Sequence, residues 1–166
     1  MDNYELLLDG HVDLLRRLSP DEPGGDHCVE AADAVHDFLE TGVVAPVDSG
    51  WGTTYRLHAD VLAGFRRVDL VRAIERLESQ GHGHHIVVRA VRAQPGHQSP
   101  HHYFVLANVR GLVIVFDAYG HLVVQGRQRI LDYATLVVGV PPGSFEYAAR
   151  GFDVEARNSL DGLFAP

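Results

Sequence analysis

Three residues of this chain have the types that catalysis by a thiol requires: a cysteine, a histidine and an acid. Cys28 is the only cysteine, and His102 and Asp117 follow it in a much later part of the chain. In a thiol hydrolase the thiolate attacks a carbonyl carbon, an imidazole takes and returns the proton, and a carboxylate orients the imidazole. The three residues are therefore candidate catalytic groups, provided that the fold brings them into one cleft.

His102 and Asp117 lie in a segment with the pattern of a β-hairpin. Two runs of apolar, β-branched and aromatic residues flank Asn108–Gly111, which has the composition of a turn. If Val109 and Arg110 form a two-residue loop, His102 lies directly opposite Asp117, and their Cβ atoms are roughly 4.5–5.5 Å apart on one face. Two alternatives remain open. A three-residue loop with a bulge would separate the pair, and both residues could instead be polar strand ends near solvent.

Cys28 lies near the start of a predicted helix that Asp26 can cap and that Gly42 can end in a left-handed turn. The unpaired N–H groups and the dipole of the first turn favour the thiolate form of Cys28, and Glu30 opposes this modestly. The alternative is that Cys28 is a small buried hydrophobic residue. Residues at helical spacing form an apolar stripe, which is Cys28, Ala31, Ala32, Val35, Phe38 and Leu39. Acids take the other face, and these are Glu30, Asp33, Asp37 and Glu40.

The remaining periodicity predicts an α+β fold in which the nucleophile-bearing helix packs on a small antiparallel sheet. Prolines at 141 and 142 mark the end of the predicted core, and residues 146–166 are expected to wrap the surface or fray. The other predicted elements are helices at 2–18 and 69–80, strands at 86–91 and 121–124, and helical turns at 61–65 and 129–133.

Composition narrows the classes of function. The 166 residues suit one compact domain, and a formal charge of -8 argues against nucleic acid as a partner. No apolar run approaches the length of a membrane span, so no membrane association is expected. The single cysteine excludes an internal disulfide and indicates a reducing compartment. The histidine-rich stretch at 82–85 matches no zinc pattern, so neither a metal nor another cofactor is expected.

The order of a thiol on a helix, then a histidine and an acid on successive strands, resembles that of papain-like enzymes. Local motifs are similar to those of the papain-fold toxins of bacteria, the Tox-PL group of polymorphic toxins, and the resemblance covers residues 26–120. The chain departs from that group at Tyr119, where glutamine is frequent, and it lacks a glutamine ahead of the nucleophile. The motifs are Cys28-Val29 with Leu39–Gly42, Gly81–Gly83 before a strand, His102–Phe104, and Gly111, Val113 and Asp117.

The resemblance implies a single papain-like domain over 1–166, with an N-terminal helix and loop (1–25), a catalytic core (26–140) and a C-terminal extension (141–166). It implies a Cys28/His102/Asp117 triad that hydrolyses amide bonds in a target-cell protein, with protein-glutamine deamidation favoured. A peptidase or a transglutaminase is the alternative. The candidates for contact with the substrate are Trp51, Tyr119 and His101. Trp51 could instead be an aromatic residue of the core, and His101 could be the base in place of His102.

The resemblance further implies a toxin that is made in the bacterial cytoplasm and delivered by a secretion or injection system into the target-cell cytoplasm, with a cognate immunity protein as a second partner. A hypothesis from another functional class also remains open. It holds that the domain is a catalytically inert papain-fold binding module or an immunity-type protein, and that Cys28 is buried and unreactive.

Overall fold

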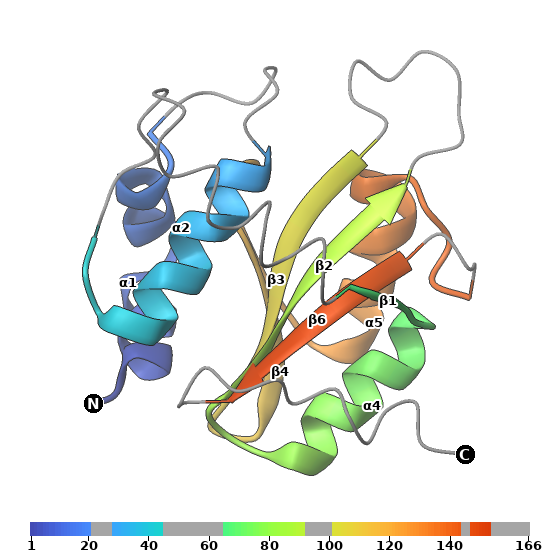
Figure 1. Cartoon of the computed structure of the whole chain (residues 1–166), viewed down its shortest axis with the longest axis horizontal. Helices are drawn as coiled ribbons and strands as arrows, with labels where there is room; N and C mark the ends of the chain where they lie inside the picture. The colour runs from blue at the N-terminus through green and yellow to red at the C-terminus, as the bar shows by residue number, and fades with distance from the viewer. Residues whose placement is uncertain (21–27, 45–64, 92–100, 144–146, 154–166) are drawn as a thin grey trace.

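The computed structural model describes residues 1–20, 28–44, 65–91, 101–143 and 147–153 (Figure 1). Trp51, Asp26 and most of the helical turn expected at 61–65 lie outside these ranges. The described part is an α+β fold in which helices cover a six-stranded antiparallel sheet with the strand order β1-β6-β2-β3-β4-β5. This confirms the fold class at the level of an antiparallel sheet packed against helices. None of the described helices is long and apolar enough to cross a membrane.

The predicted helices and most of the predicted strands are present at nearly the expected positions. The helices are α1 (Asn3–Leu18), α2 (Cys28–Thr41), α4 (Leu70–Gln80) and α5 (Arg127–Tyr133), and α5 continues into the π-helical turn η1 (Ala134–Val138). The strands are β1 (Arg66–Arg67), β2 (His84–Val91), β3 (His101–Val109), β4 (Leu112–Asp117), β5 (Leu122–Gln125) and β6 (Tyr147–Asp153).

Helix α1 starts at a capping box and contains a kink that the sequence did not predict. The Asp2 carboxylate accepts the N–H of Glu5 at 3.0 Å, and the Glu5 carboxylate accepts the N–H of Asp2 at 3.1 Å. Helical geometry is interrupted at His11, where φ is 53° and ψ is −145°. A residue with a Cβ atom rarely adopts this conformation, so the packing of the two halves of α1 has to offset local strain.

Helix α2 confirms the predicted inward stripe, since all six residues of the stripe are buried. The helix ends before Gly42, which has a φ of +72° as predicted for a left-handed turn. The predicted polar face is wrong at Asp33, which is only 4% exposed. His36 is buried as well. The reason is tertiary, because α2 packs on β3 and also against α1, so more than one face of the helix is covered.

The β3–β4 hairpin exists, but its predicted register is wrong by two residues. The two-residue loop is Arg110-Gly111, because Val109 pairs with Leu112 and Asn108 with Val113. Positive φ at both loop residues, 55° and 88°, is the type I′ geometry that matches the twist of a hairpin. A shift of two residues preserves the alternation of faces, so the side chains expected on one face remain together.

Strand β6 is the main element that the sequence did not predict. It pairs with β2 on one side and with β1 on the other, and Tyr147 and Ala149 are fully buried. The expectation that the core ends at Pro141 is therefore wrong for residues 147–153. Tyr147 also donates a hydrogen bond to the carbonyl of Val140 at 2.6 Å, which fixes the segment after η1 to the strand.

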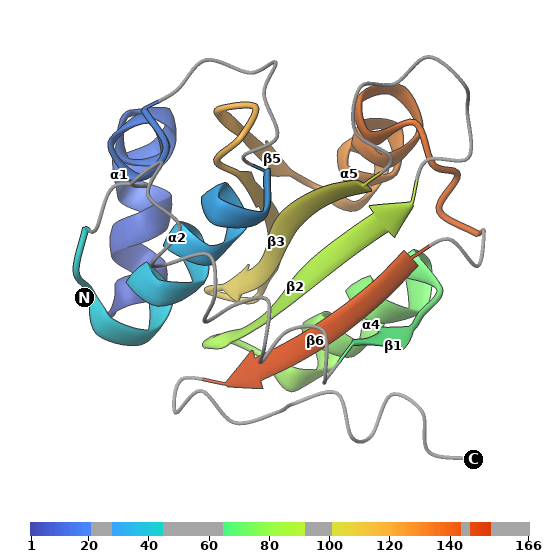
Figure 2. The same ribbon diagram turned by 45° about the horizontal axis from the view of Figure 1, so that its top comes forward.

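The sheet separates two cores (Figures 1 and 2). Tyr103, Val105 and Ala107 of β3 pack in the core that contains the buried residues of α1 and α2. Phe104 and Leu106 pack in the core of α4, α5 and η1. Successive side chains of a strand point to opposite faces, so the parity of a β3 residue decides which core it enters.

Candidate active site at the start of strand β3

His102 and Asp117 form a buried hydrogen-bonded pair. His102 Nε2 lies 2.8 Å from Asp117 Oδ2, and the two residues are 3% and 1% exposed. Continuing the observed register places Asp117 opposite Phe104, so the pair is diagonal rather than directly opposed. Diagonal neighbours on one face of an antiparallel pair are within reach of long side chains, and His102 spans this distance.

Two further donors hold the carboxylate. The Tyr133 hydroxyl donates to Asp117 Oδ2 at 2.5 Å and lies 3.3 Å from His102 Nε2, and the N–H of Gly120 donates to Oδ1 at 3.0 Å. Burial alone would raise the pKa of Asp117, but the hydrogen bond and charge of His102, together with these donors, hold that pKa below its ordinary value. The carboxylate therefore remains ionised and can stabilise an imidazolium at His102.

Aromatic rings fix the imidazole plane. The His102 ring stacks on Phe104 with centroids 6.0 Å apart, and Tyr119 meets it edge-on at 5.6 Å. Because Nε2 faces the acid, Nδ1 is the nitrogen left to exchange a proton with a nucleophile. Within the part of the chain that the structure describes, Nδ1 makes no hydrogen bond.

Cys28 lies against the backbone on either side of His102. Its thiol donates to the carbonyl of His101 at a distance of 3.7 Å, and the N–H of Tyr103 donates to the sulfur. Burial raises the pKa of the Cys28 thiol, the charge of Glu30 adds to this, and the N–H donors of Tyr103 and Val29 offset it only in part. The expectation that the start of α2 favours the thiolate is therefore wrong, since desolvation outweighs the backbone N–H donors.

The thiol and the imidazole approach β3 from different faces. Cys28 belongs to the core of α1 and α2, whereas His102 has the parity of Phe104 and bonds to Tyr133 of α5. Among the described residues, no hydrogen bond joins Cys28 Sγ to the His102 ring. The structure thus brings the base and the acid together and places the thiol beside the main chain of the base.

The other candidates lie close by. His101 has the parity of Tyr103, so its side chain leaves β3 on the face of Cys28, and burial with the charge of Arg89 lowers its pKa. The carboxylate partner nevertheless belongs to His102. Tyr119 is half-buried against the His102 ring, while the placement of Trp51 is outside the described residues.

Tyr133 is the residue that sequence reasoning missed. It closes the predicted helical turn at 129–133, and its phenol reaches the acid only because α5 packs across β4. A buried tyrosine generally finds a partner for its hydroxyl, which was the only available signal. That signal does not identify the partner.

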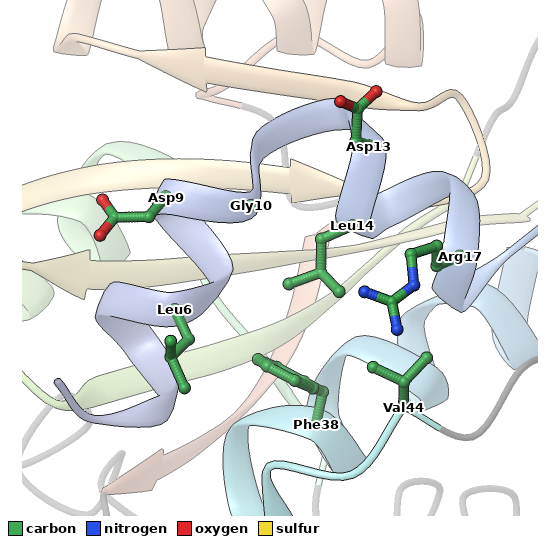
Figure 3. A pocket seen from close by; sticks show the side chains of 8 residues that line it. All are labelled: Leu6, Asp9, Gly10, Asp13, Leu14, Arg17, Phe38 and Val44. Atoms are coloured by element: carbon green, nitrogen blue, oxygen red, sulfur yellow. The ribbon is translucent and has the colours of Figure 1, made fainter.

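The structure also has a groove that contains none of the candidate catalytic residues. It lies between α1 and α2, has a volume of about 520 Å³, and opens beside the kink in α1 (Figure 3). Its lining residues are Leu6, Asp9, Gly10, Asp13, Leu14, Arg17, Phe38 and Val44. The groove is thus separate from the His102–Asp117 pair, which lies at the opposite face of the sheet.

Comparison of the chain with protein-family models, with curated proteins and with solved structures finds no match in any of the three. The inference of function therefore depends on the geometry around His102 and on the motifs in the sequence.

Proposed function

We propose that this protein is a papain-like cysteine hydrolase that cleaves amide bonds with Cys28, His102 and Asp117. The observation that carries the proposal is the buried His102–Asp117 pair, in which Nε2 is bonded to the acid and Nδ1 is left for the nucleophile. The thiol of Cys28 contacts the two peptide groups that flank the same histidine. An imidazole oriented in this way by a carboxylate is the arrangement that activates a weak nucleophile.

In the proposed reaction, Nδ1 of His102 takes the proton of Cys28 and the thiolate attacks the amide carbon. The carbon–nitrogen bond breaks, His102 returns the proton to the leaving nitrogen, and a thioester remains on Cys28. Water then attacks the thioester, giving a carboxylic acid and the free thiol. Asp117 remains ionised throughout and stabilises the imidazolium. The reaction requires Sγ and Nδ1 to come into contact. Because the two side chains approach β3 from different faces, this contact requires a rearrangement at the start of the strand in which Cys28 leaves the His101 carbonyl.

The amide that we favour is the side chain of glutamine in a target-cell protein, in which case the leaving group is ammonia. This part of the proposal comes from the resemblance to papain-fold toxins, as do delivery into the target cell and the existence of an immunity protein. Attack on a backbone amide would make the protein a peptidase, and an amine in place of water would make it a transglutaminase. The three chemistries share the same residues and differ in their products.

One observation favours a second function, that of a catalytically inert binding module. The thiol is only 5% exposed, its pKa is raised, and its hydrogen bond goes to a main-chain carbonyl. A cysteine in such a setting can be a structural residue.

Labelling with iodoacetamide separates the two functions, and it reports on one site because Cys28 is the only cysteine. If the site is catalytic, the wild type reacts near neutral pH faster than a free thiol with a pKa of about 8.5. His102→Ala and Asp117→Asn then slow the reaction. Slow labelling that is the same in all three proteins would overturn the enzymatic function.

The products divide the enzymatic alternatives. Incubation with a lysate of target cells should release ammonia for a deamidase and new protein N-termini for a peptidase. Incorporation of an added amine would indicate a transglutaminase. The matched control is Cys28→Ala, which removes the sulfur from a buried cluster that already contains Ala31 and Ala32 of the same helix. Equal release by Cys28→Ala and by the wild type would rule out catalysis by the thiol.

A further inference from the structure

A second group of polar side chains lies towards the other end of α2 from Cys28. His36 and Glu40 are one helical turn apart, and His36 Nε2 lies 2.9 Å from Glu40 Oε1. Their separation of four residues puts both side chains on one face of the helix. Asp37 is their neighbour, and one ligand atom from each of the three residues lies within 4.8 Å of the others.

His36 is positioned from behind by a chain of buried polar groups. Its Nδ1 lies 2.9 Å from Nε2 of His85, and Nδ1 of His85 lies 2.6 Å from the Tyr4 hydroxyl. His85 is 1% exposed, so the chain is shielded from solvent at this point. The chain fixes the ring of His36 and directs Nε2 towards Glu40.

This arrangement has the parts of a metal site with an outer layer of support. A histidine that binds a metal through one nitrogen is usually oriented by a hydrogen bond to the other nitrogen. His85 supplies that bond to His36, and Tyr4 supplies it to His85 in turn. Every member of the chain can either donate or accept, so the chain can remain hydrogen-bonded when Nε2 of His36 gives its lone pair to a cation.

We propose that His36, Asp37 and Glu40 bind a zinc ion. The ligand set is one neutral imidazole and two carboxylates. The two negative charges of the carboxylates balance the charge of a divalent cation. The imidazole nitrogen favours zinc over calcium and magnesium, whose ligands are almost always oxygens. Zinc is bound at about 2.0–2.2 Å by nitrogen and oxygen ligands, so rotation of the carboxylate side chains has to bring the three atoms closer together.

The accessibility of the three residues suits a site that can exchange its ion with solvent. His36 is buried, Asp37 is half-buried and Glu40 is exposed. Three protein ligands leave a fourth position of a tetrahedral ion for water. The formal charge of -8 favours the approach of a cation. The inference is independent of the proposed hydrolase function, because it involves neither the thiol nor the His102–Asp117 pair.

The test uses the full chain after removal of any purification tag, with Co²⁺ as a coloured probe and Zn²⁺ as its competitor. We expect the wild type to show d–d absorption bands that saturate at one equivalent of Co²⁺ and disappear when Zn²⁺ is added. Glu40→Gln, which changes an exposed side chain, and His36→Gln should each weaken binding by about tenfold or more, since even the loss of an outer-layer partner costs about 10–100-fold.

His84→Gln is the matched control, because the chain has eleven histidines and His84 lies beside His85 on β2 without belonging to the three-residue group. We expect it to bind Co²⁺ as the wild type does. The affinity of Tyr4→Phe for Co²⁺ should lie between that of the control and those of the ligand variants. Circular dichroism checks that each variant is folded. Affinity that is unchanged in folded Glu40→Gln, or the absence of a saturable Co²⁺ spectrum in the wild type, would overturn the proposal.

Discussion

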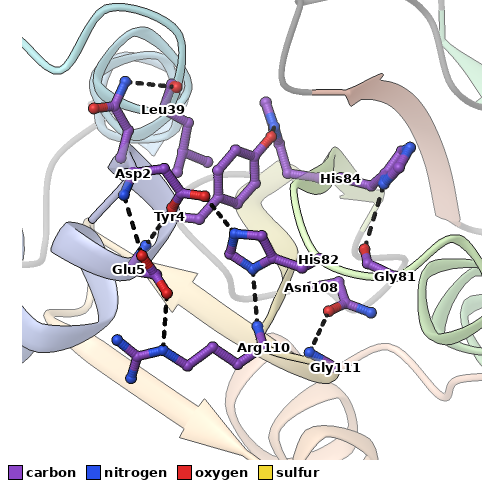
Figure 4. A network of polar contacts seen from close by, with 12 residues as sticks. Asp2, Tyr4, Glu5, Leu39, Gly81, His82, His84, Asn108, Arg110 and Gly111 are labelled. Atoms are coloured by element: carbon purple, nitrogen blue, oxygen red, sulfur yellow. Dashed lines mark hydrogen bonds and ion pairs between the residues drawn. The ribbon is translucent and has the colours of Figure 1, made fainter.

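Two histidine–aspartate pairs in this protein have the same chemical groups but different surroundings. His102 and Asp117 are almost fully buried, whereas His82 and Asp2 are paired at the surface with side chains 33% and 43% exposed. The surface pair belongs to a network at the start of α1, in which Arg110 donates its backbone N–H to His82 (Figure 4). Arg110 also forms an ion pair with Glu5.

The difference between the pairs shows why the residue types alone do not identify a site. Water competes for the groups of the surface pair, so such a pair contributes about 0–1 kcal/mol. Water does not reach the buried pair, and breaking a buried pair by removing one partner costs about 3–5 kcal/mol. The buried pair is also in contact with three aromatic rings, which restrict the orientation of the imidazole.

The largest effect is expected for Asp117→Ala. The substitution leaves the His102 ring and the Tyr133 hydroxyl without their shared acceptor in the core, so the free energy of unfolding should fall by about 3–5 kcal/mol. Urea denaturation measures this change. Asp2→Asn is the matched change in the surface pair, and a similar loss in both variants would show that burial does not distinguish them.

A smaller effect is expected for Tyr133→Phe, which removes only the phenol that donates to Asp117. A hydrogen bond to a charged group is worth about 1.5–3 kcal/mol, and the free energy of unfolding should fall by that amount. The control is Tyr147→Phe, which breaks a bond from a buried phenol to a neutral carbonyl. The pKa of Asp117, followed by NMR, should rise in Tyr133→Phe and stay unchanged in the control. If the pKa of Asp117 is unchanged in both variants, Tyr133 does not stabilise the ionised carboxylate.

Acid should destabilise the protein through Asp117. The folded-state pKa of this carboxyl is lowered from 3.8, so the folded state binds its proton more weakly than the unfolded state does. The stabilisation is therefore fully present well above pH 3.8 and is lost as the pH falls through the folded-state pKa. Denaturation as a function of pH should show a steeper acid limb for the wild type than for Asp117→Asn. Parallel limbs would contradict the direction of the shift.

The smallest effect is expected for Asp2→Asn. Asparagine caps a helix about as well as aspartate does, so the substitution removes the charge of Asp2 and preserves its role at the start of α1. The loss should be below about 1 kcal/mol and should shrink as salt is added, because salt screens surface charges. A loss that is large and independent of salt would place this pair in the same class as the buried one.

The helices could be predicted from the sequence, and so could the face of the hairpin on which each side chain lies, because both depend on local pattern. The stripe of α2 and the turn residues before Gly111 are both set by neighbours in the chain. The alternation of faces placed His102 and Asp117 on one face even though the loop was assigned one residue too early, which shifts the pairing of the two strands by two residues. An error of an even number of residues leaves every side chain on its own face.

The sequence by itself determined which residues could act, and for a two-residue loop it placed His102 and Asp117 on one face of the hairpin. Only the tertiary structure decided that β6 completes the sheet, that Tyr133 reaches Asp117, and that Cys28 approaches from the other face. These features depend on contacts between segments far apart in the chain, and no local periodicity records such contacts. Burial, which raises the pKa of Cys28, is likewise a property of the packed molecule, and so are the buried hydrogen bonds that hold the pKa of Asp117 below its ordinary value.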